Sequence, residues 1–324
     1  NTAYATYISP MGDTQNIQSN TVQVDVTALY AISLTTPVTQ QIEAGSRVVW
    51  LNTLSNNGNT QASITIQKLT GNGLNNIKIY IDTNKNGEFD ANDEVVNGSI
   101  VLAAQQSVNL WVVSTVEATV EDKQQLKLPI NAVVVEDSAA IATANNSLIA
   151  YVPQLYASKS VDQETFNPAT NKNFDLNYTL TLENKGAQAI RPTRIFIDGQ
   201  AQDMVVMVDA LPVNTTYKSA QSSNANAVIL FKTSDNNYTR QQPADLSSID
   251  ELIVAFPSIA GQTTERVQLA VRMNENVANI SVNNQFSVKY QVAAGEKTTL
   301  SNIAKTVVSG KSEITNNSGN YNRI

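Results

Sequence analysis

The sequence predicts an all-β fold, and three observations support this prediction. Short runs of alternating apolar and polar residues recur along the chain, separated by clusters of Gly, Asn and Asp. No convincing helical pattern of ten or more residues interrupts them in the first half. Charged residues make up only 15% of the chain, whereas about 25% is usual in soluble domains. With 324 residues, the chain is long enough for two tandem immunoglobulin-like β-sandwich domains.

The N-terminal residues 1–26 are predicted to form a β-hairpin that recurs later in the chain. Each copy has two alternating strands around a polar turn. With one gap, the first copy aligns with residues 284–308 at these positions: Asn1 with Asn284, Tyr7 with Tyr290, Gly12 with Gly295, Ser19 and Asn20 with Ser301 and Asn302, and Val26 with Val308. A weaker third copy runs from Asn131 to Val152. The two later copies close the strands that precede them, whereas the first copy has no strands to close.

This surplus hairpin predicts assembly by strand donation. A strand pair with an apolar face and no domain of its own can complete the open sheet of another molecule. Such a head-to-tail contact does not close on itself, so it produces a fibre of identical subunits. The side chains expected to bind the neighbouring subunit are Ala3, Ala5, Tyr7, Ile17, Val22 and Val24. The alternative is a monomeric cell-surface adhesin or binding module in which the hairpin packs in cis on the first domain.

Residues 27–152 are predicted to form the first sandwich domain. Alternation that extends from Val22 to Leu34 favours one continuous strand across the boundary with the hairpin. Further short strands are expected at residues 47–52, 63–67, 77–81, 99–103, 108–116 and 128–135. Trp50 and Trp111 lie in alternating strands, so we expect both rings in the core.

The segment between Ile81 and Val95 has the spacing of a calcium-binding loop of the EF-hand type. Oxygen-bearing side chains alternate along it, and Gly87 supplies the tight turn. The expected calcium ligands are the side chains of Asp82, Asn84, Asn86, Asp90 and Asp93 and the carbonyl of Glu88. An Asp replaces the usual bidentate Glu at the last position, which predicts a weak site filled by extracellular calcium. The alternative is an Asx-rich turn that needs no ion.

Residues 153–308 are predicted to form the second sandwich domain. Pro153 marks the boundary because proline cannot donate to a ladder, and a new alternating run begins at Tyr156. Strands are expected at residues 156–161, 174–184, 190–198, 204–208, 227–232, 249–256 and 265–273, with a single helical turn at 245–249. Residues 309–324 form a polar C-terminal tail without a core-like pattern, which we expect to lie along an intersubunit contact.

Lys159, near the start of a predicted strand, is a candidate for a covalent cross-link. Its amine could form an intramolecular isopeptide bond with an Asn or Asp side chain. Nothing in the sequence fixes the partner, so the sequence alone does not establish such a bond.

Four segments of the second half resemble the repeated β-sandwich modules of bacterial and archaeal surface proteins known as domain of unknown function number eleven. They are KSVDQ at 159–163, YTLTLENKG at 178–186, ERVQLAVRM at 265–273 and the hairpin NQFSVKY…SNIAKTVV at 284–308. The resemblance implies an extracellular immunoglobulin-like building block without catalytic activity. Mature proteins of this family often begin with a hairpin like residues 1–26, and related filaments assembled by strand exchange are known.

The composition excludes several other functions. The chain contains no Cys and no His, which removes thiol nucleophiles, Ser-His-Asp triads and imidazole or thiolate metal ligands. The net charge of −7 argues against nucleic-acid binding, and no apolar stretch of about 18 residues predicts a transmembrane segment. We therefore expect a secreted, non-enzymatic subunit of an extracellular filament, processed at Asn1, with calcium as a structural ion. Cell-surface or tip proteins are possible further partners.

Overall fold

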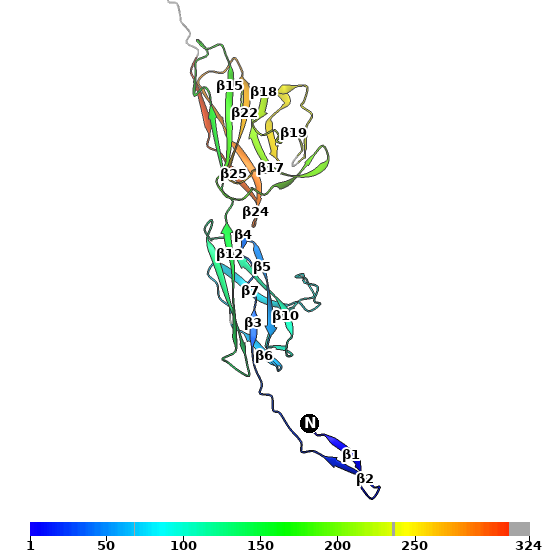
Figure 1. Ribbon diagram of the computed structural model, residues 1–324. Helices are drawn as coiled ribbons and strands as arrows, with labels where there is room; N and C mark the ends of the chain where they lie inside the picture. Colours follow the sequence, from blue (N-terminus) through cyan, green and yellow to red (C-terminus); the bar gives the residue numbers. More distant parts are fainter. Residues whose placement is uncertain (68, 235–236, 311–324) are drawn as a thin grey trace, which may run out of the picture.

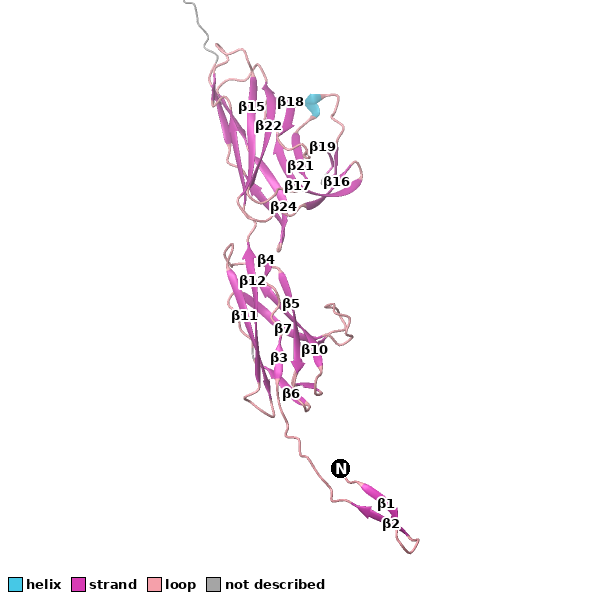
Figure 2. Ribbon diagram, in the orientation of Figure 1, coloured by secondary structure: helices cyan, strands magenta, loops and turns pink. Residues whose placement is uncertain are grey.

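The computed structural model, which describes residues 1–67, 69–234 and 237–310, confirms the all-β prediction. Two β-sandwiches are stacked end to end, and an isolated hairpin projects from one end on an extended segment (Figure 1). Within the described residues, the helical structure is a single 3-10 turn, η1 (Leu246–Ser248), where a helical turn was predicted (Figure 2). Of the predicted tail 309–324, residues 311–324 lie outside the described part of the chain.

The hairpin consists of β1 (Tyr4–Ile8) and β2 (Thr14–Gln18), which pair antiparallel with Ala5 opposite Ile17. The expectation of one continuous strand from Val22 to Leu34 is wrong for residues 22–31. Only β3 (Ile32–Leu34) is a strand in this segment. Alternation predicts which side chains suit a sheet, but a ladder also needs a neighbouring strand, and none lies beside residues 22–28.

Two five-stranded sheets form the first sandwich. One sheet has the order β3-β5-β10-β7-β8 and the other β4-β12-β11-β6-β9. The bounds of the first sheet are β5 (Arg47–Asn56), β10 (Ser107–Val116), β7 (Leu74–Ile81) and β8 (Glu94–Val95) beside β3. Those of the second are β4 (Gln40–Glu43), β12 (Ile141–Tyr151), β11 (Gln125–Val134), β6 (Ala62–Ile66) and β9 (Ile100–Leu102). Trp50 is fully buried in the core, as predicted. Trp111 is also buried, but the core prediction is wrong for it, because it lies on the face of β10 opposite the core residues Leu110 and Val112.

The second sandwich is larger and contains three sheets. A four-stranded sheet has the order β13 (Leu155–Val161), β15 (Asp175–Asn184), β22 (Thr263–Met273) and β18 (Thr215–Ser222). A three-stranded sheet has the order β14 (Thr165–Phe166), β26 (Ala304–Val308) and β23 (Ile280–Asn284). A seven-stranded sheet has the order β16 (Thr193–Ile197), β20 (Asn237–Thr239), β19 (Val228–Ser234), β21 (Glu251–Phe256), β17 (Gln200–Ala210), β24 (Phe286–Val292) and β25 (Gly295–Leu300). Alternate side chains of these strands form one large apolar core, and a smaller apolar cluster covers the other face of the seven-stranded sheet.

Polar contacts hold the two sandwiches together at their junction. Glu43, at the end of β4, is only 4% exposed. Its carboxylate accepts a hydrogen bond from the Ala293 backbone N–H at 2.7 Å and pairs with Arg191 at 2.7 Å. Gln188 and Gln41 form a further side-chain hydrogen bond between the two sandwiches. Because a buried carboxylate is costly unless it is paired, these contacts favour one fixed arrangement at the junction.

Candidate functional site

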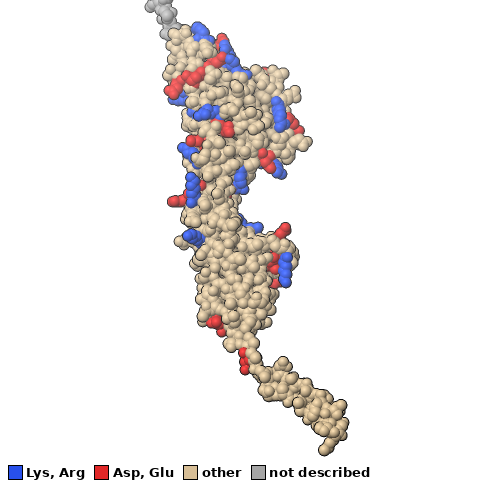
Figure 3. All heavy atoms as spheres, in the orientation of Figure 1, with Lys and Arg blue, Asp and Glu red and all other residues tan. Residues whose placement is uncertain are grey.

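Residues 1–26, here called the arm, form hydrogen bonds only among themselves within the described part of the chain. The pairing of Ala5 with Ile17 places Ala3, Ala5, Tyr7 and Ile17 on one face of the hairpin. Both large side chains of this face are exposed, Tyr7 at 51% and Ile17 at 57%. The arm contains no Lys or Arg and only two acidic residues, so its visible surface is almost entirely uncharged (Figure 3). Exposed apolar surface of this kind marks an interaction site.

The predicted contact residues Val22 and Val24 continue the apolar surface beyond the hairpin. Together with Val26 they form a row, here called the valine row, whose members are 58%, 80% and 78% exposed. Polar residues alternate with them, as on a strand that buries one face. Asn1 and Val22 exchange two hydrogen bonds, at 2.7 and 3.0 Å, which tie the start of the row to the hairpin. The arm therefore consists of two paired strands and a third strand-like segment, the valine row, and none of the three pairs with a strand of either sandwich.

The second sandwich shows the same sequence element in a packed state. There the segment aligned with the arm forms β24, β25 and β26, and β26 pairs with both β14 and β23. The residues aligned with the valine row are all buried, at 5%, 0% and 1% exposure: Ala304, Thr306 and Val308. The intervening Lys305 and Val307 are exposed, as are the residues between the valines of the arm. The arm thus exposes the positions that its internal counterpart buries.

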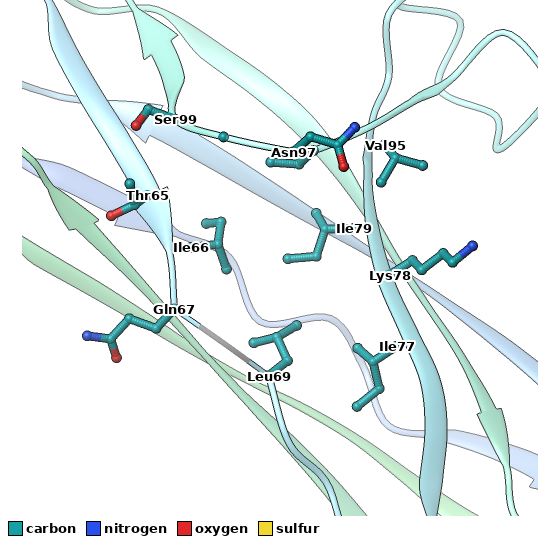
Figure 4. Close-up of a pocket in the computed structure, with 12 residues that line it drawn as sticks. Thr65, Ile66, Gln67, Leu69, Ile77, Lys78, Ile79, Val95, Asn97 and Ser99 are labelled. Atoms are coloured by element: carbon teal, nitrogen blue, oxygen red, sulfur yellow. The ribbon is translucent and has the colours of Figure 1, made fainter.

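The first sandwich carries a groove of about 600 Å³ between β6, β7 and residues 95–99, which both apolar and polar side chains line. The side chains of Ile66, Leu69, Ile77 and Ile79 lie around this opening (Figure 4). Sheet edges also border it. β9 pairs with β6 only as far as Ile64, and β8 pairs with β7 only at residues 80–81. Open strand edges beside apolar side chains are the features that an added strand requires.

The predicted calcium loop connects β7 to β8 and is organised by hydrogen bonds to Asp82, its first residue. Asp82 is 2% exposed. Its carboxylate accepts hydrogen bonds from the backbone N–H groups of Asn86 at 3.2 Å and Gly87 at 3.1 Å. Gly87 has a φ of 74°, which is the left-handed conformation that the tight turn needs. Phe89 projects from the loop onto Tyr80 and Trp111, with ring centroids 5.0 and 6.3 Å away.

The other predicted ligands converge on Asp90. One of its carboxylate oxygens accepts hydrogen bonds from the Asn84 amide at 3.1 Å and the Asn86 amide at 2.8 Å. Hydrogen bonds, chiefly from the Asn92 backbone, lower the pKa of Asp90. Asp93 is buried, and one of its oxygens has no hydrogen-bond partner. No group of three acidic residues in the described chain is close enough to hold a metal by itself. In this structure the Asn84 and Asn86 amides donate to the Asp90 oxygen that would otherwise bind a cation.

A third candidate site surrounds Lys159, of which the sequence predicts the lysine but not its partners. Lys159 is 4% exposed and forms a fully buried ion pair with Asp209 of β17. Asn284, at the end of β23, is also buried, at 3% exposure. The sequence predicts the lysine as a candidate but not these two partners, which come from distant strands. Lys159 lies within the predicted strand 156–161, whereas Asp209 directly follows the predicted strand 204–208 and Asn284 begins the predicted hairpin 284–308.

Comparisons with known proteins give structural likeness without a family. No family model matches the chain, and no curated protein matches it. The C-terminal domain of the antigen I/II polypeptide BspA of Streptococcus agalactiae aligns with 86% of this chain and 100% of its own, at 10% identity and a TM-score of 0.46. The C-terminal domain of the Streptococcus pyogenes antigen I/II-family protein AspA aligns over the same shares, at 10% identity and a TM-score of 0.41.

The major pilin subunit BcpA of Bacillus cereus is a third such structure. It aligns with 86% of this chain and 69% of its own, at 8% identity and a TM-score of 0.31. No helix in the described part of the present chain is long and apolar enough to cross a membrane. We therefore derive the function from the residues of this chain.

Proposed function

We propose that this chain is the structural subunit of an extracellular filament, in which each subunit donates its arm to the next. The observation that carries the proposal is the contrast between the arm and its internal counterpart. The valine row is 58–80% exposed, whereas the aligned residues of β26 are at most 5% exposed. Burial of apolar surface contributes roughly 25 cal/mol per Å², so the exposed apolar side chains of the arm favour its docking in a sheet.

Donation in trans agrees with the position of the arm. The hairpin projects away from both sandwiches on an extended segment (Figure 1). The first contacts of the chain with its own first sandwich come at Thr27 and Leu29, which bond with Asn59. A donor at one end and an acceptor elsewhere on the same molecule make a contact that repeats without closing. The resulting assembly is a head-to-tail homopolymer, and the proposed role needs neither catalysis nor nucleic acid.

The groove between β6 and β7 is the proposed acceptor, and the arm of a second copy is its occupant. The groove offers isoleucine and leucine side chains and open strand edges. The arm offers alternating valines, of which Val24 and Val26 make no backbone hydrogen bond within the described residues. Ladder bonds would supply affinity, and the alternate side chains would fix the register. The expected contact residues on the arm remain Ala3, Ala5, Tyr7, Ile17, Val22 and Val24. The surface-protein resemblance of the second half supports an extracellular location.

A pair of adjacent substitutions tests this proposal. We expect Val24→Arg to abolish polymerisation, because a charge at this position must be desolvated in the acceptor sheet. We expect Gln23→Arg to leave polymerisation intact, because the corresponding position of the internal copy, Lys305, is exposed and charged. Light scattering after size-exclusion chromatography and negative-stain electron microscopy measure the outcome. A wild-type chain that stays monomeric would instead favour the adhesin function, and equal polymerisation of both variants would rule out the valine row as donor.

Calcium is proposed as a structural ion of the first sandwich, held by the six predicted ligands of the loop. The unpartnered buried oxygen of Asp93 supports this proposal. Binding would require the Asn84 and Asn86 amides to turn their oxygens, in place of their nitrogens, toward the ion. The ion would hold the loop between β7 and β8 in one conformation.

Chelation tests the calcium site. An ion present at a hundredfold excess over its Kd adds about 2.7 kcal/mol to the free energy of unfolding. We therefore expect EDTA to lower the melting temperature of the first sandwich, followed by tryptophan fluorescence because Phe89 of the loop packs near Trp111. The variant with Asp82→Ala and Asp93→Ala should show no response to EDTA. An EDTA-insensitive wild type would identify the loop as an ordinary Asx-rich turn.

A further inference from the structure

Three strands of the second sandwich bring a lysine, an aspartate and an asparagine together in the core. Lys159 lies in β13, Asp209 in β17 and Asn284 at the end of β23. The side chains of Lys159 and Asp209 are fully inaccessible and form an ion pair. Burial raises the pKa of the Asp209 carboxyl, and Asn284 lies near enough to Asp209 to oppose that rise. Buried ionisable groups are rare because removing them from water is costly, so the cluster requires an explanation.

The backbone holds these three residues in a fixed arrangement. Asp209 is the ladder partner of Phe286, which follows Asn284 by two residues. On the other side, the Asn302 side chain accepts a hydrogen bond from the Lys159 N–H and donates one to the Lys159 carbonyl, both at 2.8 Å. Two residues later, Ala304 pairs with Asn284. The Asn302 side chain and the strand pairing of Ala304 therefore fix β13 and β23 to the same short segment.

Asn284 is unsatisfied in this arrangement. Neither its amide nitrogen nor its carbonyl oxygen has a hydrogen-bond partner of acceptable geometry, and one oxygen of Asp209 also lacks one. An unpaired buried polar group costs about 1–3 kcal/mol, so two on one side chain are a substantial penalty. An ion pair between Lys159 and Asp209 explains the charges but leaves Asn284 unexplained.

The surroundings favour the neutral forms of the charged pair. Burial lowers the pKa of Lys159 to about 8, against the opposing effect of Asp209. Burial also raises the pKa of Asp209. The Lys159 amine lies 4.8 Å from the ring centroid of Tyr178 and 5.9 Å from that of Phe286, so aromatic walls exclude water from it. A neutral amine is a nucleophile, and a protonated carboxyl beside it is a general acid.

We propose that Lys159 and Asn284 are joined by an intramolecular isopeptide bond, formed by the folded chain itself with Asp209 as the proton-transfer residue. The Lys159 Nζ attacks Cγ of Asn284, and the Asp209 carboxyl donates a proton to the amide. The Nζ–Cγ bond forms, the Cγ–Nδ2 bond breaks and Nδ2 leaves as ammonia. Asp209 takes up a proton from Nζ and is regenerated. The step is a condensation without oxidation or reduction, so the chain needs no other reactant.

The proposed bond removes the unsatisfied buried amide nitrogen of Asn284. The unpaired Asn284 nitrogen departs, the buried Lys159 amine becomes part of a neutral amide, and Asp209 is left as a carboxyl that can accept a hydrogen bond from the new N–H. Proximity alone makes such a reaction effective, because the fold holds amine and amide in place before they react. The bond lies within one subunit, so it forms whether or not the proposed filament assembles, and the two proposals can fail separately.

The mass of the intact wild-type chain decides the proposal. Under denaturing conditions, we expect a mass below the sequence mass by one ammonia, and a protease digest in which the peptide with Lys159 is joined to the peptide with Asn284. A wild-type mass equal to the sequence mass, with both peptides recovered unlinked, would overturn the bond. This measurement requires no variant and no assumption about assembly.

Variants identify the residues involved. Lys159→Met, Asn284→Ala and Asp209→Asn should each restore the full mass expected for the variant. Asn284→Asp should lose water in place of ammonia, which identifies the leaving group and also shows that the site is folded. The matched controls are Lys305→Met and Asn283→Ala, an exposed cross-strand pair on β26 and β23 that should retain the loss of ammonia. Loss of the cross-link in these controls, or its persistence in Asn284→Ala, would contradict the assignment.

Discussion

A chain that begins at Thr27 should remain monomeric at concentrations at which the intact chain forms fibres. In the described part of the chain the arm forms no hydrogen bond with either sandwich and contributes no residue to their cores, so its removal leaves both cores intact and removes only the donor. The expected effect is all-or-none, because each subunit in a head-to-tail polymer depends on one donor and one acceptor. Sedimentation velocity and electron microscopy of both chains measure it. Fibres from the truncated chain would show that assembly uses another surface.

Adding the arm back as a separate peptide provides the control. A synthetic peptide of residues 1–26 should bind the truncated chain and remain monomeric with it, because the bound peptide carries no further acceptor. The same peptide with Val24→Arg should not bind. An Ile77→Arg substitution in the groove should abolish binding of the wild-type peptide while the truncated chain stays folded by circular dichroism. Binding that survives Ile77→Arg would place the acceptor outside the groove between β6 and β7.

The second large effect is expected in the stability of the second sandwich. If Lys159 and Asn284 are covalently joined, the unfolded state contains a closed loop on the order of 100 residues, and loss of such a link costs about 4–5 kcal/mol. Asn284→Ala should therefore lower the free energy of unfolding by about this amount. Asn283→Ala, its exposed neighbour, should change it by less than about 0.5 kcal/mol.

The two tryptophans make this measurement specific to one sandwich. Trp50 and Trp111 both lie in the first sandwich, so tryptophan fluorescence follows that sandwich and circular dichroism follows both. In Asn284→Ala the fluorescence transition should stay in place while a transition seen only by circular dichroism moves to lower denaturant. Equal midpoints in wild type and variant would show that no covalent link stabilises the second sandwich.

Local patterns in the sequence predicted the strands and much of the core. Trp50 occupies an inward position of an alternating run, and the structure buries it completely. The same reasoning was wrong for residues 22–31, because alternation describes the faces of a strand but not whether a partner strand is present. The arm shows this limit directly, since Val24 is 80% exposed while its internal counterpart Thr306 is fully buried.

The candidate sites divide in the same way. The calcium loop is contiguous, so its spacing alone brought Asp82 and Asp90 to attention. The partners of Lys159 could not be predicted by spacing, because Asp209 and Asn284 stand on other strands that only the tertiary fold brings together. A lysine in the inward register of β13, between Ala157 and Val161, was the one local sign that its amine is buried.

The paired carboxylate of Glu43 has a consequence for the geometry of a fibre. Its bonds to Ala293 and Arg191 fix the rotation of one sandwich relative to the other, so a subunit turns as one rod. In a fibre built by arm donation, the helical twist per subunit is then set at a single joint, where the chain passes from Val26 to Thr27. Asn59 holds the chain immediately beyond that joint. Few backbone bonds there rotate freely, so we expect the helical pitch of the fibre to vary little.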